Sequence, residues 1–250
     1  MSILSINCGG QLEGPGIENE AEPFSIVPFA LYFFGQDLLD LYDASEGKDI
    51  VGGYNLSKVG APTKLAGYAT TSRNNAYLAP FTGRQLADAA GAQTGMTVIT
   101  VARCAANLQW AAWGTFSGNN VVGEVGLLHS SNRARSLAAL PYSENFIATL
   151  DANRGGHFAF YAHVVSKTRQ DIYARHAGES AMVSAKKTVA MTDVGGANFM
   201  AVGHDPYNAS WTDPGDLVLQ AFFSGALTDA QIAKLYDEAA ALLAEIGIDI

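Results

Sequence analysis

Short apolar stretches separated by Gly, Asn and polar turns recur along most of the chain, a pattern typical of β-strands. The clearest is Gly95–Arg103, whose β-branched residues predict a central strand. Further strands are predicted at Trp110–Phe116, Gly123–Leu128, Phe146–Leu150, His157–Val165, Gln170–His176 and Ala181–Val183. Asn153–Gly156 and Ala177–Ser180 have the composition of hairpin turns. This rhythm, without a helical period between strands, predicts a sandwich or jelly roll and argues against a parallel βαβ sheet.

The pattern changes near the end of the chain. Asp216–Phe223 is apolar enough for a buried strand, and Ser224-Gly225 is turn chemistry. Thr228 and Gln231 have the spacing of a capping box, which predicts a helix from Thr228 to about Ile246. One side of this helix is apolar, through Ile232, Leu235, Ala239, Leu242, Leu243 and Ile246. That side must be covered, either by the chain's own sandwich or by a partner.

Three segments follow from these patterns. Residues 1–29 form an N-terminal arm or extended segment, because the first 23 positions contain four Gly and four Glu and almost no large apolar side chain after Leu12. Residues 30–227 form the sandwich, and residues 228–250 the C-terminal amphipathic helix. The arm is either a frayed terminus or a segment that lies on a neighbouring subunit.

Charge and cysteine content narrow the function classes. The 15 basic and 24 acidic residues give a net charge of -9 without a basic cluster, so nucleic-acid binding is disfavoured. Cys8 and Cys104 lie far apart and are expected to be free thiols. The first residues lack the basic region of a signal peptide, and the apolar run Phe24–Phe34 is too short to cross a bilayer. We therefore expect a protein made in a bacterial cytoplasm, without membrane insertion.

Several stretches resemble one known family. Asp43–Gly47 resembles its early Asp-x-Ser-x-Gly turn, and Gly95–Arg103 is similar to its core strand. Phe199–Gly203, followed by Phe222–Tyr236, resembles its closing strand and helix. The family is the LamG-like branch of the concanavalin A-like lectin and glucanase superfamily, and the resemblance covers roughly residues 30–240. It implies an all-β fold, a two-sheet antiparallel jelly-roll sandwich with a C-terminal α-helix, and sites on the concave sheet and its rim loops.

Catalytic residues are not evident. The glucanases of this superfamily carry a Glu-x-Asp-x-x-Glu strand, because retaining hydrolysis needs two carboxylates about 5 Å apart. No such strand is present, and Glu124 is an isolated strand acid. A Gly-x-Ser-x-Gly nucleophile motif is also missing. The sequence therefore predicts a protein that is not an enzyme.

The stretch from His204 to Asp216 is the most site-like part of the sequence. Its aromatic and oxygen-bearing side chains suit a sugar, and its carboxylates suit Ca²⁺; a rigid, Pro-fixed loop is the alternative interpretation. Tyr161 shares one strand face with His157 and His163, where it could stack on a sugar, although such polar residues also occur on ordinary sheet faces. The predicted ligand-binding residues are Asp205, Tyr207, Asn208, Trp211, Asp213 and Tyr161, and the predicted calcium ligands are Asp205, Asp213 and Asp216.

The sequence thus favours a non-enzymatic binding or assembly module. An acidic, arm-bearing protein without a signal peptide or disulfides is similar to a phage or prophage virion component, such as a tail, fibre or decoration protein. Its expected partners are other virion proteins and copies of itself, with a trimer as the expected oligomer. One alternative is a carbohydrate-binding lectin, with or without calcium as its only cofactor. A polysaccharide hydrolase is the other.

Overall fold

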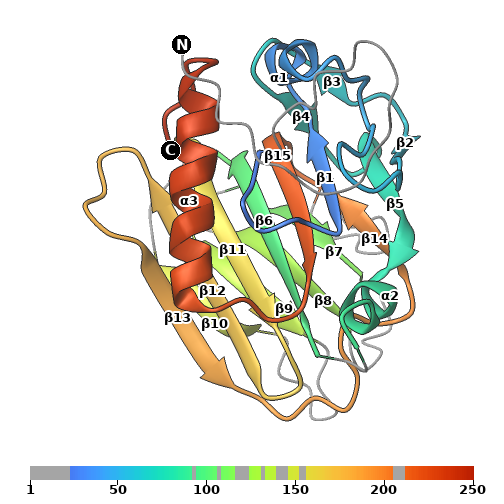
Figure 1. Cartoon of the computed structure of the whole chain (residues 1–250), viewed down its shortest axis with the longest axis vertical. Helices are drawn as coiled ribbons and strands as arrows, with labels where there is room; N and C mark the ends of the chain where they lie inside the picture. Colours follow the sequence, from blue (N-terminus) through green and yellow to red (C-terminus); the bar gives the residue numbers. More distant parts are fainter. Residues whose placement is uncertain are drawn as a thin grey trace, which may run out of the picture.

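Two antiparallel β-sheets packed face to face make up the body of the protein, and helix α3 (Asp229–Ala244) lies across the outside of one of them (Figure 1). The computed structural model describes residues 23–91, 94–105, 108–115, 124–130, 133–138, 146–151, 156–204 and 212–250. The predicted fold class, an all-β jelly-roll sandwich with a C-terminal helix, is confirmed.

The strands of each sheet come from distant parts of the chain. Sheet A has the order β13 (Val183–Thr188), β12 (Arg169–His176), β11 (Ala159–Val165), β6 (Met96–Arg103), β15 (Gly215–Ser224), β4 (Ala69–Thr71) and β3 (Thr63–Lys64), and β1 (Ala30–Phe33) also pairs with β15. Sheet B has the order β10 (Phe146–Asp151), β9 (Arg133–Ala138), β8 (Val125–Ser130), β7 (Trp110–Gly114), β14 (Phe199–Val202), β5 (Ala76–Thr82) and β2 (Ser57–Val59).

The central strands of sheet A, β12, β11, β6 and β15, are buried on both faces. The inner face of the sheet packs on sheet B in one hydrophobic core, which includes Val98, Trp113 and Phe222. Its outer face packs in a second core under α3, with Ile99 and Leu243 among its members. This double burial explains why β6 reads as an almost continuous apolar run, since neither face needs polar side chains.

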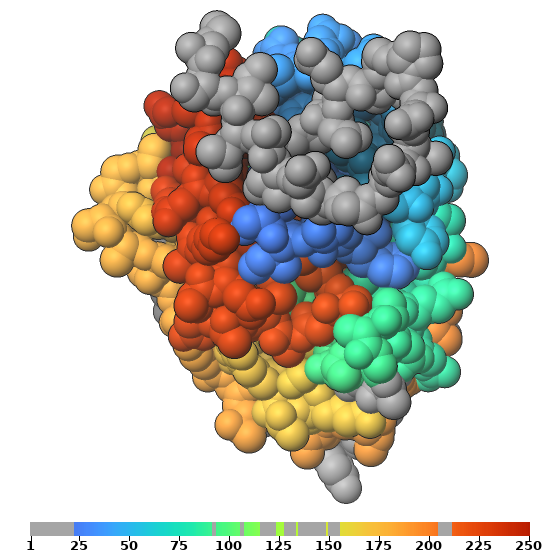
Figure 2. Space-filling view, viewed as in Figure 1, coloured from blue at the N-terminus to red at the C-terminus, as the bar shows by residue number. Residues whose placement is uncertain are grey.

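Helix α3 begins where its sequence predicts. The Gln231 backbone N–H donates to Thr228 Oγ1 at 3.3 Å, and the Thr228 N–H donates to Gln231 Oε1 at 2.9 Å, so the capping box is formed. The apolar side of α3 contacts the chain's own sheet: Ile232, Leu235 and Leu243 are fully buried there. In Figure 2 the surface of α3 adjoins that of residues 23–33, and the Ser25 N–H donates to Glu238 at 3.2 Å.

Other local predictions were wrong. Two short helices interrupt the strands, α1 (Gln36–Leu41) and α2 (Gly83–Asp88), the second with its own capping box from Thr82 and Gln85. The turn predicted at Asn153–Gly156 lies outside the described residues except for Gly156, and the flanking strands β10 and β11 do not form a hairpin, because β10 belongs to sheet B and β11 to sheet A. The strand predicted at Ala181–Val183 begins only at its last residue and continues to Thr188. Among the described helices, none combines the length and apolar composition needed to cross a bilayer.

Candidate functional site

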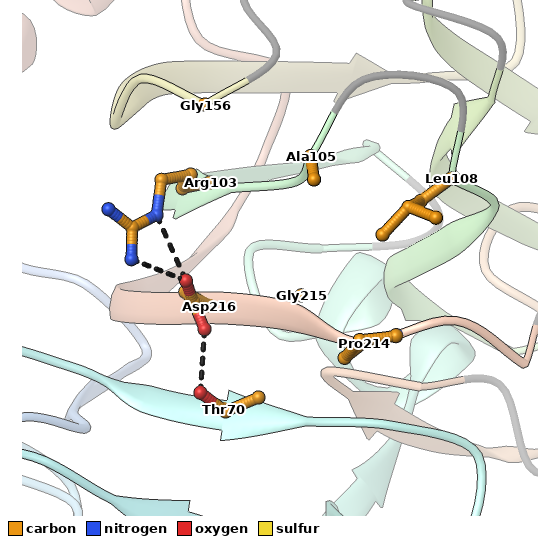
Figure 3. A pocket seen from close by; sticks show the side chains of 8 residues that line it. All are labelled: Thr70, Arg103, Ala105, Leu108, Gly156, Pro214, Gly215 and Asp216. Atoms are coloured by element: carbon orange, nitrogen blue, oxygen red, sulfur yellow. Dashed lines mark hydrogen bonds and ion pairs between the residues drawn. The ribbon is translucent and has the colours of Figure 1, made fainter.

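A pocket of about 330 Å³ opens at one end of sheet A. Three neighbouring strands place polar side chains there, because Asp216 at the start of β15 is paired in register with Arg103 of β6 and Thr70 of β4. Figure 3 shows these three side chains together at one side of the pocket, with Leu108 and Pro214 at the other. The lining is completed by Ala105, Gly156 and Gly215. The pocket therefore has a polar and an apolar side.

Asp216 is the centre of the polar side. Arg103 donates to Asp216 Oδ2 from Nε at 2.9 Å and from Nη2 at 2.7 Å. The Thr70 hydroxyl donates to Asp216 Oδ1 at 2.6 Å. Such charge-assisted bonds fix the orientation of both partners. The side chains remain accessible from the pocket, with exposures of 29% for Arg103 and 18% for Asp216.

Arg103 also stacks on two aromatic rings. Its guanidinium carbon lies 4.4 Å from the ring centroid of Phe158 and 4.9 Å from that of Tyr68. Burial disfavours the positive charge, but the hydrogen bond to Asp216 and the charge of that carboxylate outweigh it and raise the pKa of Arg103. The guanidinium is therefore a fixed cation that connects the pocket to an aromatic pair.

Cys104 directly follows Arg103 at the end of β6 and is a free, buried thiol. Burial raises its pKa to about 12, and the negative charges of Asp213 and Asp216 act in the same direction. The thiol therefore stays protonated at neutral pH and is a poor nucleophile. The other cysteine, Cys8, lies outside the described residues.

Of the described residues of the predicted site loop, those at its end reach this pocket. Pro214 and Asp216 line the pocket. Asp213 does not line it, and its Oδ2 instead accepts a hydrogen bond from the Gln109 N–H at 2.7 Å. Four other predicted ligand-binding residues lie outside the described part of the chain: Asp205, Tyr207, Asn208 and Trp211. Asp216 is already paired with Arg103, and no group of three potential metal ligands occurs among the described residues. Calcium binding by Asp205, Asp213 and Asp216 stays a prediction.

Tyr161 is not on an accessible face. It projects into the core between the two sheets and is only 3% exposed, so it cannot stack on a sugar from solvent in this structure. His163 is fully buried on the same face, whereas His157 precedes β11 and stacks on His176 with ring centroids 5.3 Å apart. The expectation of an open Tyr161 face is therefore wrong, because sheet B covers it.

Thr70, Arg103 and the aromatic pair were missed by the sequence analysis. Arg103 and Asp216 are 113 positions apart, and only the pairing of β6 with β15 brings them together. A weak signal was present, since Arg103 is a charged residue at the end of an apolar strand and Asp216 stands at the beginning of another.

Comparison with known proteins supports the fold. No protein-family model matches the chain, and no curated protein matches its sequence. Among solved structures, a receptor-binding domain of botulinum neurotoxin C/D mosaic serotype is similar with a TM-score of 0.61 and 11% identity, over 84% of this chain and 51% of that one. The binding domain of botulinum neurotoxin DC in complex with SialylT gives 0.56 and 13%, over 76% and 48%.

A sialidase from Trypanosoma rangeli in complex with sialic acid is also similar, with a TM-score of 0.55 and 11% identity, over 83% of this chain and 32% of the sialidase. The chain thus spans about a third to a half of the proteins it matches. At such low identity the likeness establishes the β-sandwich fold alone, and these neighbours include both an enzyme and binding domains.

Proposed function

We propose that this chain is a non-enzymatic, lectin-like binding module whose glycan-binding site is the pocket between β4, β6 and β15. The observation that carries the proposal is the group of Thr70, Arg103 and Asp216 beside the rings of Tyr68 and Phe158. Ligand sites typically combine an apolar lining with a few placed polar groups that fix orientation. A sugar ring matches this combination, since it has apolar C–H faces and hydroxyls around its edge.

The polar group retains capacity for a ligand. A guanidinium has five N–H donors, of which Arg103 uses two on Asp216. A carboxylate offers about four acceptor positions, and Asp216 accepts three hydrogen bonds from described residues. Sugar hydroxyls both donate and accept, so they can use the remaining positions on both side chains.

The same group does not suit hydrolysis. Retaining and inverting glycosidases both need two carboxylates that flank the scissile bond. Asp216 is the one carboxylate among the described lining residues, and Arg103 and Thr70 hold it in hydrogen bonds. The pocket therefore supports binding rather than bond cleavage.

A glycan array tests the proposal, with sialylated glycans and their unsialylated counterparts, because two of the similar structures contain sialic acid or SialylT. Hits are then titrated with and without EDTA, which tests the calcium prediction. Thr70→Val and Arg103→Gln should each weaken binding at least about tenfold, equivalent to about 1.4 kcal/mol. Arg84→Gln is the matched control, since Arg84 of α2 forms an ion pair with Asp193 outside the pocket lining.

If the folded Thr70→Val and Arg103→Gln proteins bind glycan with unchanged affinity, the glycan-binding site lies outside this pocket. A blank array, in the presence and absence of calcium, would contradict glycan binding itself. Circular dichroism and thermal unfolding of each variant show whether a loss of binding comes from a loss of fold.

Virion assembly is a separate proposal that comes from the sequence. It requires a homo-oligomer, for which a trimer is expected, and the first 22 residues of the predicted arm (residues 1–29) lie outside the described part of the chain. The apolar side of α3 is used within the chain, so we infer that α3 does not build the oligomer through this side. Sedimentation equilibrium provides the test: a trimer would support the assembly role, and a monomer at high concentration would contradict it.

A further inference from the structure

The net charge of the candidate pocket bears on which glycans it can accept. Arg103 is the one cationic side chain among the described lining residues, and Asp216 forms an ion pair with it. The two charges cancel. A second carboxylate, Asp213, precedes the lining residue Pro214 and contributes to the negative potential at Cys104. Among the described lining residues and Asp213 together, two carboxylates therefore stand against one cation.

Three undescribed stretches of sequence lie close to the lining residues along the chain, and the first of them, residues 106–107, is uncharged. Residues 152–155 contain one Arg and residues 205–211 contain one Asp. Their formal charges sum to zero, so they do not alter the balance of the local sequence. The chain as a whole carries a net charge of -9, which also opposes the approach of anions.

We propose that the pocket selects uncharged glycans and discriminates against sialylated ones, because Asp216 neutralises the cation that would otherwise bind a sugar carboxylate. This inference rests on the proposed function and specifies its ligand class. It also distinguishes this chain from the similar structures that contain sialic acid or SialylT. Their sequence identity to this chain is too low for their ligands to be carried over to it.

The geometry of the ion pair supports the discrimination. A carboxylate is best recognised by two parallel N–H groups of an arginine. On Arg103 the edge formed by Nε and Nη2 is occupied by Asp216 Oδ2, at 2.9 and 2.7 Å. A ligand carboxylate close to the remaining N–H groups would also lie close to Asp216 and be repelled by it. Neutral hydroxyls meet no such penalty.

The test uses a panel of glycans, each present with and without its terminal sialic acid. For the unmodified chain, the unsialylated member of a pair should bind at least about tenfold more tightly, because like charges are brought together in the other complex. Asp216→Asn removes one negative charge, preserves the side-chain shape and exposes the charge of Arg103. This variant should move the preference about tenfold or more toward the sialylated members, and its binding should weaken with added salt.

Asp193→Asn is the matched control: it releases Arg84 from a similar ion pair on α2, and it should leave the preference unchanged. Tighter binding of sialylated glycans by the unmodified chain, or an unchanged preference in folded Asp216→Asn, would overturn the selectivity while leaving glycan binding intact. Failure of every glycan to bind would overturn both the selectivity and the proposed function.

Discussion

Gly215 lies directly against the indole of Trp110, so that a Cβ atom at position 215 would overlap the ring. Trp110 cannot easily move away, because its Nε1–H donates to the Gly203 carbonyl at 2.8 Å in the core between the sheets. The neighbour of Gly215 is Asp216, so the same contact sets the position of the central carboxylate of the pocket. Packing between the sheets and the geometry of the candidate site are thus directly linked.

The first prediction follows from this contact. Gly215→Ala should lower the free energy of unfolding by about 1 to 3 kcal/mol, because overpacking forces a backbone or side-chain shift. It should also weaken glycan binding, since Asp216 shifts with its neighbour. Denaturant unfolding checks the first effect.

Gly178→Ala is the control. Gly178 has a φ of 89° but nothing within 4 Å of its Cβ position, so the substitution adds backbone strain alone and glycan binding should not change. Wild-type stability of Gly215→Ala would contradict the packing argument.

The sequence predicted β6 and α3, whose local patterns are the clearest in the chain. β6 was predicted because both of its faces need apolar residues, and α3 because Thr228 and Gln231 mark its start. In contrast, β2 and β3 are two or three residues long and largely exposed, so no apolar pattern marks them. α2 has only six residues, too few for a helical period to be visible.

The candidate site was predicted less completely, for a topological reason. Asp216 was identified because it closes a loop rich in acids and aromatics. Its partners Arg103 and Thr70 lie on other strands. The order of strands within a sheet cannot be predicted from the local sequence of each strand. Tyr161 was misplaced for a related reason, because alternation along a strand identifies two faces but not which one another sheet covers.

The second prediction concerns α3. Leu243 is fully buried between α3 and the outer face of sheet A. Leu243→Ala should therefore lower the free energy of unfolding by about 3 kcal/mol, since it removes apolar contacts and leaves a cavity. Lys234→Ala on the exposed side of the same helix should change it by less than about 0.5 kcal/mol. Equal effects of the two substitutions in chemical denaturation would show that α3 does not hold this position in solution.

The third prediction is a pH dependence. Burial lowers the pKa of His163 from 6.5 to about 3, so the residue is neutral in the folded protein at moderately acidic pH. Above pH 6.5 His163 is neutral in both the folded and the unfolded protein, so its full contribution to the free energy of unfolding is present. Below pH 6.5 only the unfolded chain binds the proton, so the free energy of unfolding falls by about 1.4 kcal/mol per pH unit until the pH approaches 3.

His163→Gln removes this titration and keeps a neutral polar side chain. Other groups titrate in both proteins, so the measured quantity is the difference between their unfolding free energies at pH 7, 6, 5 and 4, an experimental range chosen to bracket the histidine transition. The wild-type protein should lose stability more steeply than the variant over this range. Parallel pH profiles would show that His163 is protonated or accessible in the folded state.

The last prediction compares two threonines of β6 that are both fully buried but face opposite cores. Thr97 faces α3, and its hydroxyl donates to the Gly225 carbonyl and accepts from the Leu227 N–H, each at 3.0 Å. Thr100 faces sheet B, and its hydroxyl has no hydrogen-bond partner among the described residues. Thr97→Val should lower the free energy of unfolding by about 1 to 3 kcal/mol, because it leaves a buried N–H and a half-buried carbonyl without this partner. Thr100→Val removes a desolvated hydroxyl and should raise stability by about 1 kcal/mol. A loss of stability in Thr100→Val would mean that this hydroxyl is hydrogen-bonded in solution.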